Sequence, residues 1–163
     1  MNDYDQALHE FQLAEQARRS AAGWLEAFEA ALVSRDAARI GALFHDDSHW
    51  RDILAFTWHL TSAAGRESIA ARLAAAQART AAQGFDLPRG RKPPRRVTRL
   101  GIDSVEAIFE FTTAEGRGAG IIRLSPAPEG GDAMKAWLLS TTLEALAGHE
   151  ETTGANRPTG AAY

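Results

Sequence analysis

Cysteine is absent from this chain of 163 residues, so it can form no disulfide framework and use no thiolate chemistry. No apolar run approaches the roughly 20 residues that a membrane-spanning helix needs. The polar N-terminus, Met1-Asn2-Asp3-Tyr4-Asp5, lacks the basic and apolar regions of a secretion signal. These absences predict a cytoplasmic protein with no membrane partner.

The charge balance is slightly acidic, with 18 Lys and Arg against 21 Asp and Glu and a formal net charge of −3. The densest basic cluster, between Arg89 and Arg96, lies among prolines and is typical of an exposed connection. A protein whose main task is to neutralise nucleic-acid phosphates needs a much more basic surface. The sequence therefore predicts no nucleic-acid partner.

The length fits one domain with flanking segments. We expect a helical extension over residues 1–19, an α+β domain over residues 20–147, and a flexible tail or the start of a linker over residues 148–163. The last segment has no apolar period and few large apolar groups, which is typical of a chain that lacks a core of its own.

Apolar residues at helical spacing predict helices before any strand. The first covers residues 3–33 and is either two helices or one helix broken near Gly23. A short helix over residues 37–43 follows, and Asp36 should cap it because its side chain can accept the free N–H groups of the first turn. A third helix is expected over residues 65–80, where alanine is frequent.

Aromatic and β-branched residues predict strands over 50–54 and 56–61, with a bend at Ala55. Three antiparallel strands should follow, since side chains alternate with a period of two. Their predicted faces are Val105, Ala107, Phe109 and Phe111; Gly120, Ile122 and Leu124; and Ala133, Lys135, Trp137, Leu139 and Thr141. This order predicts an α+β fold in which a curved, mostly antiparallel sheet forms a cone-shaped barrel round the N-terminal helices. Bulky apolar groups on both faces, as at Ile121-Ile122 and Leu138-Leu139, predict a homodimer through the sheet.

Asp52 is the main candidate for a functional group, because it stands among aromatic and aliphatic neighbours. A buried carboxylate is costly unless a partner satisfies it or a reaction uses it. Alternation should point it into the cone with Trp50 and Leu54. Asp52 is then either a general base or a carboxylate satisfied by an indole N–H or a backbone donor. His59 is the second catalytic candidate, since it can share a proton with Asp52 across the hairpin.

A pocket for a small apolar or aromatic ligand is expected around Asp52, although core packing explains its aromatic residues equally well. The candidate lining residues are Trp24, Phe28, Trp50, Asp52, Phe56, Trp58 and Trp137. His45, Asp46, Asp47 and His49 offer metal-ligand chemistry, but their spacing matches no known ligand pattern. The sequence therefore predicts neither a metal site nor a bound cofactor.

Residues 20 to 146 contain two motif segments, Trp24…Phe28…Leu32…Asp36…Leu43-Phe44…Asp46-Asp47-Ser48…Trp50…Asp52 and Gly65-Arg66-Glu67-Ser68-Ile69. With these segments, the region resembles the SnoaL-like branch of the nuclear transport factor 2-like superfamily. The resemblance implies the cone-shaped α+β barrel. Because that superfamily contains isomerases, cyclases, hydrolases and binding domains, the fold alone does not give the reaction.

A narrower resemblance lies in residues 46–58, in Lys135-Ala136-Trp137 and in residues 146–151. These segments are similar to the N-terminal domain that precedes the dinucleotide-binding part of some bacterial flavin-containing monooxygenases. No Gly-x-Gly-x-x-Gly segment joins a strand to a helix here. The resemblance implies a small-molecule-binding and dimerisation domain that is accessory to a flavoprotein.

Ketosteroid isomerases, in the same superfamily, have their catalytic base at the position that matches Asp52. By motif alignment Phe28 falls where those enzymes have a tyrosine donor, and Gly120 falls near their second acid. Losing one oxyanion donor costs about 100- to 1000-fold in rate. The alternative is a stand-alone isomerase, cyclase, hydrolase or lyase with Asp52 as the general base, and the missing donors favour the binding role.

Overall fold

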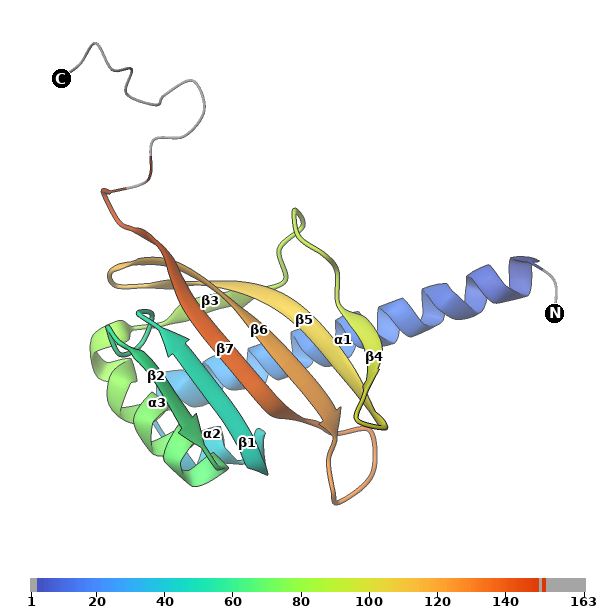
Figure 1. Cartoon of the computed structure of the whole chain (residues 1–163), viewed down its shortest axis with the longest axis horizontal. Helices are drawn as coiled ribbons and strands as arrows, with labels where there is room; N and C mark the ends of the chain where they lie inside the picture. The colour runs from blue at the N-terminus through green and yellow to red at the C-terminus, as the bar shows by residue number, and fades with distance from the viewer. Residues whose placement is uncertain (1–2, 150, 152–163) are drawn as a thin grey trace, which may run out of the picture.

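The computed structural model describes residues 3–149 and residue 151. In these residues two helices come first, then two strands, a third helix and five more strands, and this α+β order confirms the predicted fold class (Figure 1). The helices are α1 (Asp3–Ser34), α2 (Ala37–Gly41) and α3 (Arg66–Thr80). The strands are β1 (Phe44–Ile53), β2 (Leu60–Ala64), β3 (Gln83–Asp86), β4 (Arg95–Arg99), β5 (Ile102–Thr113), β6 (Gly116–Pro126) and β7 (Met134–Leu146). None of the helices in this part of the chain has the length and apolarity to cross a membrane.

The strands form one curved sheet in the order β2-β1-β7-β6-β5-β3, with β4 also paired to β5. Every pairing is antiparallel except that of β1 with β7, which is parallel. The predicted mostly antiparallel sheet is therefore confirmed. Helix α1 runs along the inner face of this sheet, and α3 lies against β1 and β2 (Figure 1).

Helix α1 is continuous through Gly23, so the predicted break there is wrong, and so is the alternative of two helices. A glycine inside a helix costs only about 1 kcal/mol relative to alanine. Burial of the residues on either side outweighs this cost, since Ala21, Trp24, Leu25 and Phe28 all lie in the core. The predicted cap of α2 is confirmed, because the Asp36 carboxylate accepts hydrogen bonds from the backbone N–H groups of Ala38 (2.9 Å) and Arg39 (3.3 Å).

The first hairpin differs from the sequence expectation in its boundaries. Strand β1 already begins at Phe44, since pairing with β7 extends it through Asp46 and Asp47, residues of low strand propensity. The predicted strand over residues 56–61 is wrong for most of its length, because residues 54–59 form the connecting loop and β2 begins at Leu60. The short strands β3 and β4 were not predicted.

The predicted faces of β5 and β6 are confirmed, since the residues assigned to them are buried against the helices. The predicted face of β7 is wrong in part, because the register shifts between Arg123 and Leu124 and breaks the alternation. As a result Leu139 and Thr141 are buried, whereas Trp137 lies 6.0 Å from the Arg123 guanidinium and stays partly exposed.

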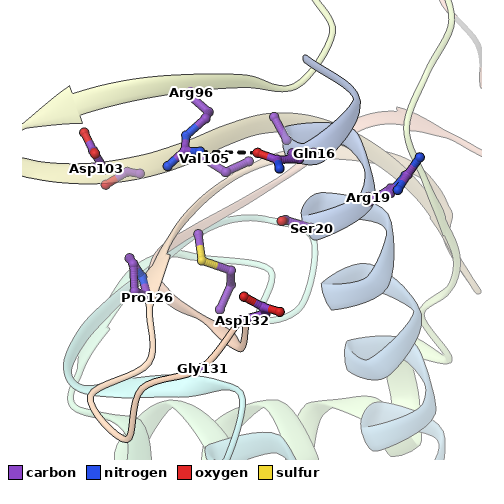
Figure 2. Close-up of a pocket in the computed structure, with 12 residues that line it drawn as sticks. Gln16, Arg19, Ser20, Arg96, Asp103, Val105, Pro126, Gly131 and Asp132 are labelled. Carbon is purple, nitrogen blue, oxygen red and sulfur yellow. Dashed lines mark hydrogen bonds between the residues drawn. The ribbon is translucent and has the colours of Figure 1, made fainter. Parts of the chain in front are cut away.

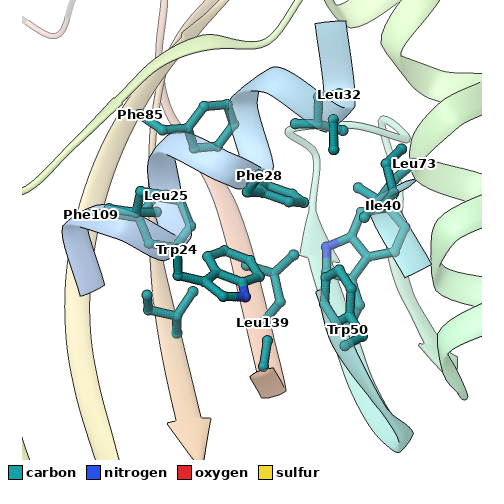
Figure 3. Packing of buried hydrophobic residues seen from close by; sticks show 14 of the residues in the cluster. Trp24, Leu25, Phe28, Leu32, Ile40, Trp50, Leu73, Phe85, Phe109 and Leu139 are labelled. Atoms are coloured by element: carbon teal, nitrogen blue, oxygen red, sulfur yellow. The ribbon is translucent and has the colours of Figure 1, made fainter. Parts of the chain in front are cut away.

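Aromatic rings fill the interior of the cone (Figure 3). Trp24 stacks on Phe28 with 4.7 Å between ring centroids, and Phe85 stacks on Phe111 at 5.0 Å. Further rings connect these two pairs: Phe44 and Phe85 contact Phe28, Phe109 contacts Phe85 and Phe111, and Phe56 lies between Trp50 and Phe111. Rings in edge and stacked contact add about 0.5–1.5 kcal/mol per pair beyond their burial, so this interior is a packed core.

A cluster of one carboxylate and three arginines joins β4 to β5 and β6. Burial by itself would raise the pKa of Glu106, but hydrogen bonds from Arg123, Arg99 and Arg95 outweigh it and hold this pKa below its ordinary value. The Glu106 side chain is only 12% exposed, and its nearest partner is Arg123, at 2.6 Å.

Glu106→Gln should lower the free energy of unfolding by about 1–2 kcal/mol at neutral pH. Because the pKa is lowered in the folded state, the stabilisation is complete above the pKa of an unfolded glutamate, about 4.3, and is lost as the pH falls through the folded value. Urea unfolding at several pH values should therefore show a difference in the free energy of unfolding between the wild type and Glu106→Gln that disappears below about pH 4. Glu110→Gln, at the exposed pair with Arg91, is the control and should cost under about 1 kcal/mol. A difference between the wild type and Glu106→Gln that grows as the pH falls would contradict this prediction.

Candidate functional site

The carboxylate of Asp52 is fully buried, with 0% of the residue exposed, and both of its oxygens accept hydrogen bonds. Oδ1 accepts from the Thr141 hydroxyl at 2.7 Å and from the Phe56 backbone N–H at 3.2 Å. Oδ2 accepts from the N–H of Phe56 (3.0 Å), the N–H of Thr57 (2.9 Å) and the Thr57 hydroxyl (2.8 Å). Five contacts from four donors therefore surround this one carboxylate.

The Trp50 indole reaches Asp52 only through Thr141. Its Nε1–H donates to the Thr141 hydroxyl at 3.0 Å, and that hydroxyl in turn donates to Asp52. An indole and a backbone donor were the two expected ways of satisfying Asp52. The structure has the backbone donors directly on the carboxylate and the indole one hydroxyl away.

The loop held by Asp52 has an unfavourable backbone. Leu54 and Trp58 both have positive φ, 66° and 57°, which costs bulky side chains of the order of 1–3 kcal/mol each. Its conformation is also held from α3, since the Arg79 guanidinium donates to the Phe56 carbonyl at 2.5 Å and to Glu115 at 2.7 Å. The buried carboxylate and Arg79 together stabilise the turn and keep the Phe56 ring in the core.

The other candidate residues lie in three different environments. Trp24, Phe28, Trp50 and Phe56 are core residues, and the Trp24 indole donates to the Leu43 carbonyl at 3.0 Å. Trp58 is 41% exposed on the loop, and Trp137 lies beside Arg123. His59 is exposed, and within the described residues its ring makes no hydrogen bond to Asp52.

The two positions that motif alignment matches to the oxyanion donors of ketosteroid isomerases are closed by packing. Phe28 is stacked on Trp24 and has no exposed surface. At Gly120 an added Cβ would lie 2.2 Å from the Phe109 ring and 2.3 Å from the Ser140 carbonyl oxygen. An acid at residue 120 therefore has no space, and the Phe109 ring occupies that part of the cone.

A cavity of about 470 Å³ opens at the other end of the cone, between α1, the β4–β5 hairpin and the loop before β7 (Figure 2). We call it the mouth cavity. It is lined by Gln16, Ala17, Arg19, Ser20, Arg96, Asp103, Ser104, Val105, Pro126, Gly131, Asp132 and Met134. Apolar side chains therefore combine with two arginines and two aspartates. The sequence did not predict this site. Each of its polar residues has the pattern of an ordinary solvent-exposed residue, and only the curvature of the sheet brings their segments together.

A second hollow lies on the outer face of the sheet, over β2, β1 and β7, with a volume of about 710 Å³. We call it the outer groove, and its side chains include His49, Arg51, Ser62, Ala64, Leu138 and Ser140. Ile121 pairs with Ser140 at its border and is 45% exposed. This face therefore carries apolar groups that residues 3–149 leave exposed.

The sequence matches no protein-family profile and no curated protein. Its structure is similar to a nuclear transport factor 2-like protein with a cystatin-like fold from Novosphingobium aromaticivorans, with a TM-score of 0.53 and 17% identity over 88% of this chain and 91% of that one. It is also similar to a nuclear transport factor 2-like superfamily protein from Salmonella enterica, with a TM-score of 0.55 and 11% identity over 89% and 99% of the two chains. A domain of unknown function from Nostoc punctiforme gives a TM-score of 0.54 at 12% identity over 89% and 80%. Together with the curved sheet and its inner helix, these likenesses show that the chain has the nuclear transport factor 2-like, or cystatin-like, fold.

Proposed function

We propose that this chain is a small-molecule-binding and dimerisation domain of the SnoaL-like type, accessory to a flavin-dependent monooxygenase. The observation that carries the proposal is the buried carboxylate of Asp52. Its hydrogen bonds build a loop, and the residue has no exposed surface. Asp52 thus has a structural task in the fold.

A general base needs a free lone pair within hydrogen-bond reach of the substrate proton. To use Asp52 in this way, a substrate would have to displace donors from Thr141 or from the loop, and each buried donor left unsatisfied costs about 1–3 kcal/mol. It would also have to displace Phe56, which is buried between Trp50 and Phe111. The alternative of a stand-alone isomerase, cyclase, hydrolase or lyase is therefore less well supported.

The mouth cavity is the site we propose for the ligand. Its volume falls within the roughly 300–1,000 Å³ of small-molecule sites, and it combines apolar walls with a few polar groups, as such sites do. Val105 and Met134 provide apolar surface for a flat ligand, and Arg19 and Arg96 can orient an acceptor group. A small apolar or aromatic molecule with one polar substituent suits this lining.

Dimerisation is proposed through the outer face of the sheet, on which Ile121 and Leu138 lie close to the outer groove. Ile121→Arg should convert a dimer into a monomer, because it places two charges, one from each copy, in the apolar centre of a two-fold interface. Light scattering at micromolar concentration measures the mass. Val33→Arg, at an exposed position of α1 away from the sheet, is the control and should leave the mass unchanged. A wild-type chain of monomer mass would contradict the dimer.

The flavoprotein partner is proposed from the resemblance in residues 46–58, 135–137 and 146–151. Where a separate flavin-binding protein is encoded directly after this chain, we expect the two purified proteins to elute together. Separate elution at micromolar concentration would remove the flavoprotein from the proposal. The ligand site and the dimer would still stand, because they depend on different residues.

A further inference from the structure

The first half of α1 extends past the edge of the sheet and leads away from the rest of the fold (Figure 1). We call residues 4–15 the α1 arm. Three large apolar side chains on it are exposed: Tyr4 by 73%, Leu8 by 45% and Phe11 by 64%. Their spacing of four and then three residues places them on one stripe of the helix.

The arm's apolar stripe borders the buried face of the same helix, because Tyr4 and Phe11 lie at seven-residue steps from Leu25 and Leu32, which are buried. At about 100° per residue, Phe11 lies only about 40° round the helix from Leu25, whereas the centre of the arm's stripe lies roughly 150° from a second buried row. That row contains Ala17, Ala21, Trp24, Phe28 and Ala31. Tyr4, Leu8 and Phe11 are exposed because this part of α1 extends past the edge of the sheet, so the described part of the sheet leaves them uncovered (Figure 1).

The charges along α1 indicate what does cover the stripe. The arm contains Asp5, Glu10 and Glu15 and no Lys or Arg, and Arg18 and Arg19 follow directly and are exposed. Two copies that pair side by side in the same direction would place acids beside acids. Two copies that run in opposite directions, centred near Phe11, would bring position 18 of one helix opposite position 4 of the other, so that Asp5 of each copy lies near Arg18 and Arg19 of the other.

We propose that the α1 arm is a self-association surface, on which the arm of a second copy packs antiparallel with the Phe11 side chains close to the two-fold axis. Tyr4, Leu8 and Phe11 of both copies form the apolar seam, and Arg18 and Arg19 flank its ends. This surface is separate from the outer face of the sheet. If the α1 arm proved not to self-associate, the proposed dimer through the sheet would still stand. If the sheet proved not to dimerise, the proposal for the arm would still stand.

Disulfide trapping tests the pairing, because the chain contains no cysteine of its own. Phe11→Cys should form a covalent dimer under mild oxidation, since two thiols near a two-fold axis meet at high effective concentration. Val33→Cys is the matched control, because Val33 lies on the same helix and is 65% exposed against 64% for Phe11. We expect cross-linking at residue 11 to be at least about tenfold faster than at residue 33. Equal rates at the two positions would overturn the proposal.

The direction of pairing needs two further variants. When Tyr4→Cys and Arg18→Cys chains are mixed, antiparallel arms should give mainly the mixed dimer, with little of either pure dimer. A predominance of pure Tyr4→Cys dimers would show parallel arms and overturn the proposed arrangement. Running both tests in the Ile121→Arg background removes any contribution from the sheet face. Thermal unfolding monitored by circular dichroism establishes that each variant is folded, since all of these positions are exposed.

Discussion

Asp52→Ala should lower the free energy of unfolding by about 3–5 kcal/mol, because it removes the shared acceptor of four donors, two of them buried and two partly buried. These donors are the N–H groups of Phe56 and Thr57 and the hydroxyls of Thr57 and Thr141. The loop that they hold also contains Leu54 and Trp58 at positive φ, so nothing local would keep its conformation. Urea unfolding followed by tryptophan fluorescence measures the change.

Asp52→Asn tests the two acceptor oxygens apart from the shape of the side chain, because asparagine has nearly the same shape but only one acceptor oxygen. One amide oxygen can replace Oδ2 and keep three contacts, while the NH₂ group must face the Thr141 hydroxyl, which can turn to accept. We expect a loss of about 1–2 kcal/mol. Asp47→Ala, at an exposed position on the same strand, is the control and should change stability by less than about 0.5 kcal/mol. If Asp52→Ala were as stable as the wild type, the structural role proposed for Asp52 would fall.

Gly120→Ala should be the second large effect, with a loss of about 3 kcal/mol or more from overpacking. The added methyl would lie 2.2 Å from the Phe109 ring and 2.3 Å from the Ser140 carbonyl oxygen, which is sheet backbone and cannot move alone. Thermal unfolding by circular dichroism gives the size of the effect. Gly23→Ala should instead raise stability by up to about 1 kcal/mol, since nothing lies within 4 Å of its Cβ position and α1 is helical there.

A double variant distinguishes the two contacts at Gly120. Adding Phe109→Leu removes the ring but leaves the Ser140 carbonyl in place. We expect Gly120→Ala to cost less in that background than in the wild type, although its cost should not vanish. If the cost were the same in both backgrounds, the Phe109 ring would not be what closes this part of the cone.

The sequence was informative where residues follow a regular period over a long segment. The alternation in β5 and the alanine-rich stretch of α3 gave the correct elements and, for β5, the correct buried face. The shift opposite Arg123 was not predictable, since one extra residue in β7 reverses every side chain beyond it and leaves no trace in composition. Strands β3 and β4 are short and polar, so their own residues do not favour a strand. They are strands because they pair with β5.

The role of Asp52 was left open between two alternatives for a similar reason. The sequence places it on a strand with its side chain inward, which the structure confirms. What surrounds the carboxylate depends on Thr141, 89 residues away, and on how the loop after Ile53 turns back. Such contacts follow from the parallel pairing of β1 with β7, which no local pattern encodes. Local sequence patterns could not predict the mouth cavity for the same reason, because α1, β4, β5 and the β6–β7 loop each contribute to it.

Mapping ligand binding by ¹H–¹⁵N nuclear magnetic resonance tests the central claim most directly, namely that Asp52 supports the fold while small molecules bind at the mouth cavity. Small aromatic fragments that carry one acidic or polar group would be titrated one at a time into the labelled chain. We predict shifts for the backbone amides of Ser20, Ser104 and Met134, with those of Phe56, Thr57 and Thr141 unchanged. Saturable shifts at Phe56, Thr57 and Thr141, with the mouth residues unaffected, would contradict the account and return Asp52 to a role in ligand chemistry.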